Sequence, residues 1–278
     1  MARPYLVMVR AGAASLHQQW LADDPDRNWD CWVSWYCEPA GHGEAAVEFE
    51  SDGGDNKFEG YLQGRDALAL SLDEYRYVAL LDDDLEFPPG GISQTFSQCE
   101  RAHADLAQPA LRWGSNVNHD VTLYNPLTDV RRVSFVEVMM PFFSKDTLRF
   151  LEPSFLLSKS SWGIDYAWGS QLAHRRGDPG KLMIVDAVQV HHTKPFDTKQ
   201  GAFYRKLAAM GVDAAAEYAR IKAASPSFGG LKSLRSGHLA AGLWRLLPTP
   251  LLGMAVRLGE SIKKRRHRRL YVLNGGQA

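Results

Sequence analysis

Three consecutive aspartates, Asp82, Asp83 and Asp84, are the strongest chemical signal in the sequence. They directly follow the apolar run at residues 75–81, which predicts a buried strand. Open α/β sheets bind their ligands beyond the carboxyl ends of the strands. Because residues two apart on an extended segment point to the same side, we expect Asp82 and Asp84 to share one divalent cation. Carboxylate oxygens favour Mg²⁺ or Mn²⁺, which keep coordination positions open for phosphates.

The acidic triplet has other interpretations. It is compatible with a solvated loop that caps the next helix. A haloacid-dehalogenase-type phosphatase or phosphotransferase would use Asp82 as its nucleophile. That class usually continues Asp-x-Asp-Gly-Thr, whereas Asp84 is followed by Leu85-Glu86-Phe87. The spacing therefore favours glycosyl transfer from a nucleotide sugar, in which an Asp-x-Asp pair holds the metal that neutralises the departing diphosphate.

Two adjacent histidines end the apolar run at residues 182–190. Since side chains alternate along a strand, the rings of His191 and His192 face opposite ways, and we expect at most one of them to join the triplet as a metal ligand. Lys194 follows closely and is predicted to neutralise diphosphate. A purely structural role for the histidine pair stays open.

The segment Trp162-Gly163-Ile164-Asp165-Tyr166 is a second candidate site. Glycine lets a ligand approach the backbone closely, and the flat Trp162 ring is suited to stacking on a sugar. Asp165 is then placed to accept the proton of an attacking hydroxyl, as general-base catalysis requires. The alternative is an ordinary helix start in which Trp162 and Trp168 pack in the core.

Glu137 lies inside the apolar run at residues 134–140 and needs a partner if it is buried, because an unpaired buried carboxylate is costly. The nearby bases Arg131, Arg132 and Lys145 are the expected partners. Glu137 would then either hold an acceptor hydroxyl or brace the sheet.

The elements that position these residues alternate along the chain. This alternation predicts an α/β fold with an open, mostly parallel sheet covered by helices. The expected strands span residues 6–9, 29–36, 75–81, 134–140 and 182–190, and the expected helices span residues 15–21, 57–72, 92–106 and 202–222.

Composition places the chain among soluble globular proteins. Of its 278 residues, 45% are hydrophobic and 23% are charged, which excludes a disordered or collagen-like chain. The three cysteines, Cys31, Cys37 and Cys99, lack zinc-ligand spacing and disfavour a disulfide scaffold. We find no secretory signal and no run of about 18 apolar residues, so the expected location is the cytoplasm.

The charges are distributed unevenly. Residues 227–278 contain ten Lys or Arg and one Glu, a net charge of 10 − 1 = +9, which leaves 22 − 31 = −9 for the rest. We therefore expect a catalytic domain at residues 1–225 and a basic, amphipathic helical tail at residues 226–278. An apolar stretch beside a polybasic run is typical of a peripheral anchor on an anionic membrane. The alternative is a helix docked on the domain, and no nucleic acid is expected because nothing else in the chain reads bases.

Six segments, spread over roughly residues 5–205, resemble the family known as domain of unknown function 707 and occur in the same order as in that family. That family is similar to the GT-A class of glycosyltransferases. The matching segments are Lys57-Phe58, 77–87 (YVALLDDDLEF), 106–111 (LAQPAL), 130–144 (VRRVSFVEVMMPFFS), 161–169 (SWGIDYAWG) and 184–195 (IVDAVQVHHTKP).

The resemblance implies a GT-A-like (Rossmann-like) αβα sandwich that binds a nucleotide-sugar donor and a saccharide or lipid-linked acceptor. It implies that Asp82 and Asp84 bind Mn²⁺ or Mg²⁺, with His192 or His191 as a late metal ligand. Asp165 is the implied base, and a single base on the acceptor side fits inversion. The other candidates are Arg10, Lys57, Asp83 and Lys194 on the donor side, and Trp162, Gly163 and Glu137 on the acceptor side. A catalytically silent carbohydrate-binding protein on the same scaffold is the non-enzymatic alternative.

Overall fold

The hydrophobic strand β1 (Tyr5–Ala11) lies inside a ten-stranded sheet, with β2 and β4 as its parallel neighbours. The structure is a computed structural model and describes residues 3–37, 46–176, 180–194, 202–225, 233–239, 258–259 and 261–267. The strands are β1, β2 (Trp29–Trp35), β3 (Phe49–Ser51), β4 (Tyr77–Asp82), β5 (Leu85–Glu86), β6 (Leu106–Leu111), β7 (Thr128–Val133), β8 (Phe142–Ser144), β9 (Leu182–His192) and β10 (Ser233–Leu239).

The strand order is β10-β7-β9-β6-β8-β4-β1-β2-β3, with the short β5 paired to β9 outside this path. Only β7 and β8 oppose the common direction of the other strands on the path. The sheet is therefore mixed but mostly parallel in direction, as the sequence predicts.

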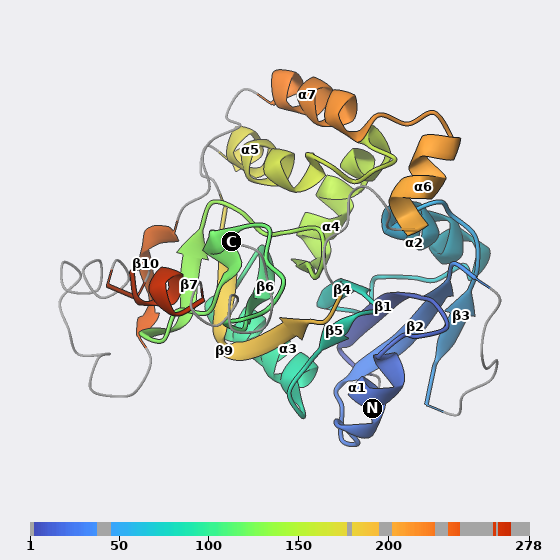
Figure 1. Ribbon diagram of the computed structural model, residues 1–278. Helices are drawn as coiled ribbons and strands as arrows, with labels where there is room; N and C mark the ends of the chain where they lie inside the picture. The colour runs from blue at the N-terminus through green and yellow to red at the C-terminus, as the bar shows by residue number, and fades with distance from the viewer. Residues whose placement is uncertain are drawn as a thin grey trace.

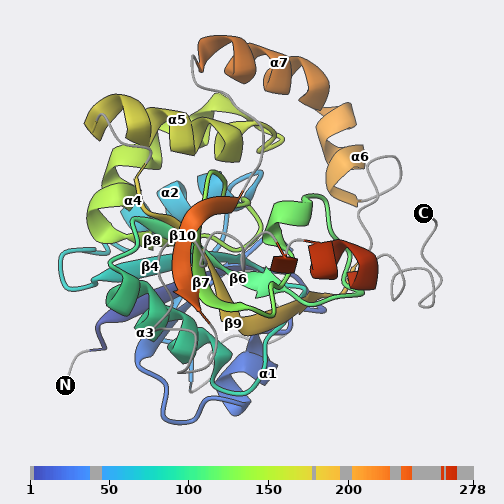
Figure 2. The same ribbon diagram turned by 90° about the vertical axis from the view of Figure 1, so that its left-hand side faces the viewer.

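Helices cover both faces of the sheet, which gives three layers (Figures 1 and 2). In Figure 1, α1 and α3 lie on one face, and α2, α4, α5 and α7 lie on the other. The helices are α1 (His17–Ala22), α2 (Lys57–Ala67), α3 (Gly91–Ala102), α4 (Lys145–Leu151), α5 (Ile164–Arg176), α6 (Ala202–Ala209) and α7 (Ala214–Ala224), with 3₁₀ turns η1 (Asp120–Thr122) and η2 (Glu152–Leu157).

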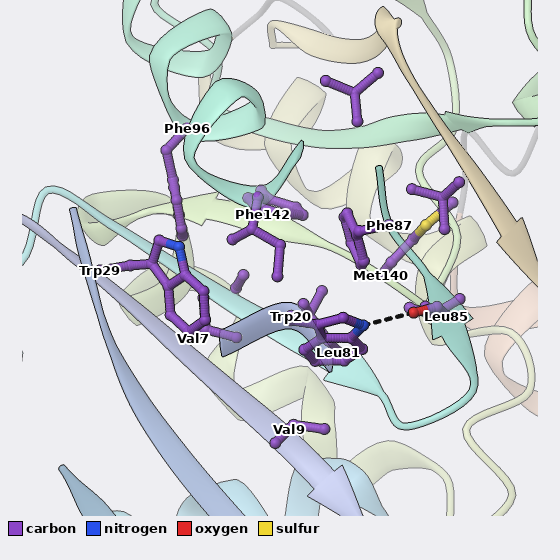
Figure 3. Packing of buried hydrophobic residues seen from close by; sticks show 14 of the residues in the cluster. Val7, Val9, Trp20, Trp29, Leu81, Leu85, Phe87, Phe96, Met140 and Phe142 are labelled. Carbon is purple, nitrogen blue, oxygen red and sulfur yellow. Dashed lines mark hydrogen bonds between the residues drawn. The ribbon is translucent and has the colours of Figure 1, made fainter. Parts of the chain in front are cut away.

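Strand β1 is buried on both sides, and its alternate residues enter two separate cores. Val7 and Val9 pack in the cluster that includes α1 and α3, whereas Leu6 and Met8 pack in the other. Figure 3 shows the first of these cores. There the Trp20 indole N–H donates to the Leu85 carbonyl at 2.7 Å, which fixes α1 against β5, directly after the acidic triplet.

The expected strand at residues 134–140 is wrong. This segment is a loop between β7 and β8, although Phe135, Val136 and Met140 are buried. The Glu137 backbone N–H donates to the Gln108 side chain at 2.6 Å rather than to a neighbouring strand. The preceding residues Thr128–Val133 form the strand instead, with the charged side chain of Arg131 buried.

The expected helices differ from the observed ones in their bounds; the helix expected at residues 57–72, for example, ends at Ala67. The expected helix at residues 202–222 is divided into α6 and α7 by Gly211, whose φ of +70° stops the first helix, and by Asp213, which caps the second. The expected helix at residues 92–106 ends at Ala102. His103 then adopts a left-handed conformation, and β6 begins at Leu106.

Part of the 226–278 segment adds to the sheet, since β10 pairs antiparallel with β7. Residues 258–259 and 261–267, here the C-terminal helical segment, are helical. Most of the apolar stretch at residues 239–258 lies outside the described residues. Among the helices that the structure describes, none is both long and apolar enough to cross a membrane.

Candidate functional site

One pocket of about 950 Å³ opens beyond the carboxyl ends of β1, β4 and β9. Every site residue predicted from the sequence lines it except His191. The predicted residues in its wall are Arg10, Lys57, Asp82, Asp83, Asp84, Glu137, Trp162, Gly163, Asp165, His192 and Lys194. The structure thus brings together segments that are far apart in the sequence.

The first aspartate of the triplet is paired with a lysine. Lys57, in the first turn of α2, places Nζ 2.8 Å from Asp82 Oδ1. The same ammonium group donates to the carbonyl oxygens of Val138 and Met139. Lys57 therefore holds the 134–140 loop against the end of β4.

Asp83 connects three segments of the pocket wall through hydrogen bonds. Its Oδ2 accepts from the Gly12 N–H at 2.8 Å and from the Tyr36 hydroxyl at 3.1 Å, and its Oδ1 accepts from Lys194 Nζ at 3.1 Å. This carboxylate joins the turn after β1, the end of β2 and the segment after β9.

Asp84 and His192 meet because β5 pairs antiparallel with the end of β9, with Leu85 opposite His192. His192 Nε2 lies 3.4 Å from Asp84 Oδ2. Burial raises the pKa of Asp84, but the hydrogen bond and charge of His192 and the charge of Lys194 together lower it by more. The net pKa of Asp84 is therefore below its usual value. His191 does not line the pocket, and burial together with the charge of Arg112 lowers its pKa.

The side chains of Asp84 and His192 are of the types that bind divalent cations. Asp84 Oδ1 is buried and accepts no hydrogen bond from the described residues. A carboxylate oxygen beside an imidazole suits Mn²⁺. Among the described residues, no group of three or more His, Cys, Asp or Glu is arranged to hold a metal ion.

Asp165, in the first turn of α5, lines the same pocket with a buried carboxyl group. Its Oδ1 accepts from the Tyr166 N–H at 2.9 Å, and its Oδ2 accepts from the Val138 N–H at 3.4 Å. Burial, reinforced by the nearby charge of Glu137, raises the pKa of Asp165 to about 8. Such a group changes protonation near neutral pH, as a general base should.

Glu137 is buried, but its partner is not one of the predicted bases. Its Oε1 accepts from the Asn118 amide at 3.2 Å. Arg131 is instead paired with Asp186 at 2.9 Å, with both side chains fully buried. Because burial outweighs the Asn118 bond, the pKa of Glu137 is raised to about 7.

Aromatic side chains of α5, α6 and α7 and of the segment before α5 line part of the pocket. The Trp162 indole N–H donates to the Tyr204 hydroxyl at 3.0 Å, which ties α6 to the start of α5. Tyr166 packs edge-to-face on Tyr218 of α7 and on His119. Gly163 adopts a φ of +88°, a conformation that other residues rarely adopt. Tyr204, Tyr218 and His119 were not predicted from the sequence, because helices α6 and α7 and the loop at residues 112–124 carry no motif of their own.

Arg10, in the pocket wall, is held by hydrogen bonds to the protein. Its guanidinium donates to Ser34 Oγ at 2.8 Å, to the Trp35 carbonyl at 3.1 Å and to the Gly54 carbonyl at 2.6 Å. A Cβ on Gly60 would lie 2.7 Å from the Arg10 Nη1 atom, so a larger residue there would displace the guanidinium. Arg10 therefore fixes the loop before α2 and contributes its charge to the pocket wall.

No protein-family model matches the sequence, and neither does any curated protein. A solved structure of GalNAc-T7 with UDP, GalNAc and Mn²⁺ is similar, with 10% identity and a TM-score of 0.54. The similarity shows that the two chains share a fold. The match covers 79% of this chain and 47% of that one, so this chain spans about half the length of its structural neighbour. A proposed nucleotide-diphospho-sugar transferase from Desulfovibrio desulfuricans G20 aligns with 12% identity over 78% of this chain and 99% of its own, with a TM-score of 0.43.

Proposed function

We propose that this protein transfers a glycosyl group from a nucleoside diphosphate sugar to a hydroxyl acceptor. One observation carries the proposal: the Asp84–His192 pair and the buried Asp165 carboxyl group, whose pKa is raised, line the same pocket. The GT-A-like fold supports it. The narrower resemblance to domain of unknown function 707 remains a prediction.

On the donor side, Asp84 and His192 would hold Mn²⁺ or Mg²⁺, with Asp82 as an additional carboxylate. The bound cation would offset the charge that builds on the departing diphosphate. Lys194, with Nζ 3.1 Å from Asp83 Oδ1 and 4.0 Å from Asp84 Oδ2, supplies a second positive charge at the same place.

On the acceptor side, deprotonated Asp165 removes the proton of the attacking hydroxyl group. The oxygen bonds to the anomeric carbon of the sugar while the bond from that carbon to the diphosphate oxygen breaks, and the proton remains on Asp165. One base on the acceptor side fits inversion. The aromatic wall formed by Trp162 and Tyr204 fits a saccharide acceptor, free or lipid-linked.

A screen of nucleoside diphosphate sugars tests this function by measuring Mn²⁺-dependent thermal stabilisation and donor hydrolysis. We expect one donor to stabilise the protein only when Mn²⁺ is present and to be hydrolysed slowly without an acceptor. A phosphoryl group trapped on Asp82 would instead identify a phosphatase or phosphotransferase. Sugar binding that survives chelation, without turnover of any donor, would identify a carbohydrate-binding protein.

A further inference from the structure

The C-terminal helical segment docks on the loop at residues 112–124, here the site loop. The Arg266 guanidinium lies 5.3 Å from the centre of the Trp113 ring. The Gly114 N–H donates to His267 Nδ1 at 3.3 Å. In both ribbon views the red C-terminal helix lies beside this green loop (Figures 1 and 2).

Two buried residues of the segment, Gly259 and Lys263, also lie against the protein. Gly259 approaches Asn125 so closely that an added Cβ would lie 1.8 Å from Asn125 Oδ1. Lys263 is fully buried, and Lys264 Nζ lies 3.8 Å from Asp120 Oδ2. Some of the basic residues that the sequence assigned to a membrane anchor therefore contact the protein itself.

The same loop holds the pocket side chains from its other side. The His192 N–H donates to Ser115 Oγ at 2.8 Å, and the Asn116 amide donates to the His192 carbonyl at 3.2 Å. Asn116 O also lies 3.2 Å from His192 Nδ1, so this carbonyl orients the ring. Two positions further, Asn118 donates to Glu137. One loop thus connects the C-terminal helical segment to two residues of the pocket.

We propose that Arg266 and His267 are positioning residues: by fixing Trp113 and Gly114 they hold the site loop in the arrangement that aims His192 at Asp84. The consequence for metal binding rests on the proposed function. The mechanical part does not, because it concerns only the contacts between the tail, the loop and β9.

Hydrogen exchange of the His192 amide in the full-length protein tests the mechanical part. Arg266→Ala and His267→Ala should each speed this exchange roughly three- to tenfold, the size expected when a cation–π contact or a single hydrogen bond is lost. Arg265→Ala is the matched control: it removes the same charge from the same turn, and Arg265 is exposed and forms no ion pair within the described part of the chain. Arg266→Lys keeps the cation over the ring and should restore protection.

Core amides of β1, such as that of Val7, must stay protected, which separates a local effect from general loss of stability. Equal His192 exchange in Arg266→Ala and Arg265→Ala would overturn the proposal, as would an effect confined to residues 112–114. In a parallel titration, Arg266→Ala should bind Mn²⁺ several-fold more weakly than Arg265→Ala. If the unmodified protein binds no Mn²⁺, the proposed function fails, and the exchange experiment still decides the role of the tail.

Discussion

Lys57 Nζ lies 2.8 Å from Asp82 Oδ1, so the first carboxylate of the triplet already has a cationic partner. Asp84, two residues later, has a buried oxygen without a hydrogen-bond donor among the described residues. The two carboxylates are therefore not equivalent. A cation that uses Asp82 competes with Lys57, whereas a cation bound by Asp84 and His192 does not.

Lys57→Met should lower the stability of the metal-free protein and enlarge its stabilisation by Mn²⁺, because the added cation then replaces the missing ammonium beside Asp82. We expect the Mn²⁺-induced rise in Tm to exceed that of the unmodified protein by roughly 2–4 °C, the effect of about 1 kcal/mol in a protein of this size. Thermal unfolding with and without Mn²⁺ measures it. Lys145→Met, remote from the pocket, is the control, and equal Mn²⁺-induced shifts in the two variants would contradict the competition.

The adjacent histidines provide a matched pair for the metal site. His192→Ala should weaken Mn²⁺ binding by at least about tenfold, since it removes the imidazole beside Asp84. His191→Ala removes the same group from the neighbouring residue, which does not line the pocket, and should leave the affinity nearly unchanged. Titration calorimetry of both variants decides the matter. A larger loss in His191→Ala would reverse the assignment.

Asp165→Asn should reduce kcat for sugar transfer about 10²- to 10⁴-fold, the range for loss of a general base. In the unmodified protein kcat/KM should rise with pH up to about 8, as the carboxyl group loses its proton. The variant should lack this rise. Asp146→Asn, on the exposed side of α4, controls for the change of charge. A smaller loss of kcat would show that Asp165 is not the base, and so would a rise of kcat/KM with pH that persists in Asp165→Asn.

The same carboxyl group affects stability. Its pKa is raised from 3.8 to about 8 in the folded protein, so the folded state holds the proton more tightly than the unfolded state. The stability that this carboxyl group contributes is fully present below pH about 4. It is lost as the pH rises towards about 8, with a limiting slope of about 1.4 kcal/mol per pH unit. Asp165→Asn should lose less stability between pH 5 and pH 8 than the unmodified protein does. Urea unfolding at both pH values measures the difference, and parallel losses would show that Asp165 titrates normally.

The membrane hypothesis for the tail can be tested separately by flotation with anionic liposomes. We expect a Lys264→Glu/Arg265→Glu variant to float less than the unmodified protein, because each basic residue near such a surface contributes roughly 1 kcal/mol. These two side chains are exposed in the docked segment. Equal flotation of both proteins would exclude these residues as membrane contacts.

Strands with continuous apolar sequence could be predicted from the sequence because both faces of the sheet are covered. Residues 75–81 and 182–190 have this pattern, and they correspond to β4 and β9. The acidic triplet and the histidine pair then follow from their places at strand ends. Prediction failed where polar or constrained residues lie inside the sheet, as with buried Arg131 in β7 and Pro109 at the irregular pairing of β6 with β9.

The wrong strand at residues 134–140 has a different cause. Burial alone does not define a strand, and here Lys57, Gln108 and Asp165 bind the backbone groups that a neighbouring strand would otherwise pair. These partners are distant in the sequence, so no local pattern reveals them. The division of the helix expected at residues 202–222 could have been predicted from the sequence, because Gly211 is a helix stop signal and Asp213 is a helix start signal.

The pairing of β5 with β9 also has a consequence for biosynthesis. Asp84 and Thr193, joined by this pairing, are 109 residues apart in the chain. During translation the aspartates therefore leave the ribosome long before their imidazole partner does. A nascent chain that ends before β9 has the triplet but not the pocket, and so the Asp84–His192 pair forms only after most of the sheet has been synthesised.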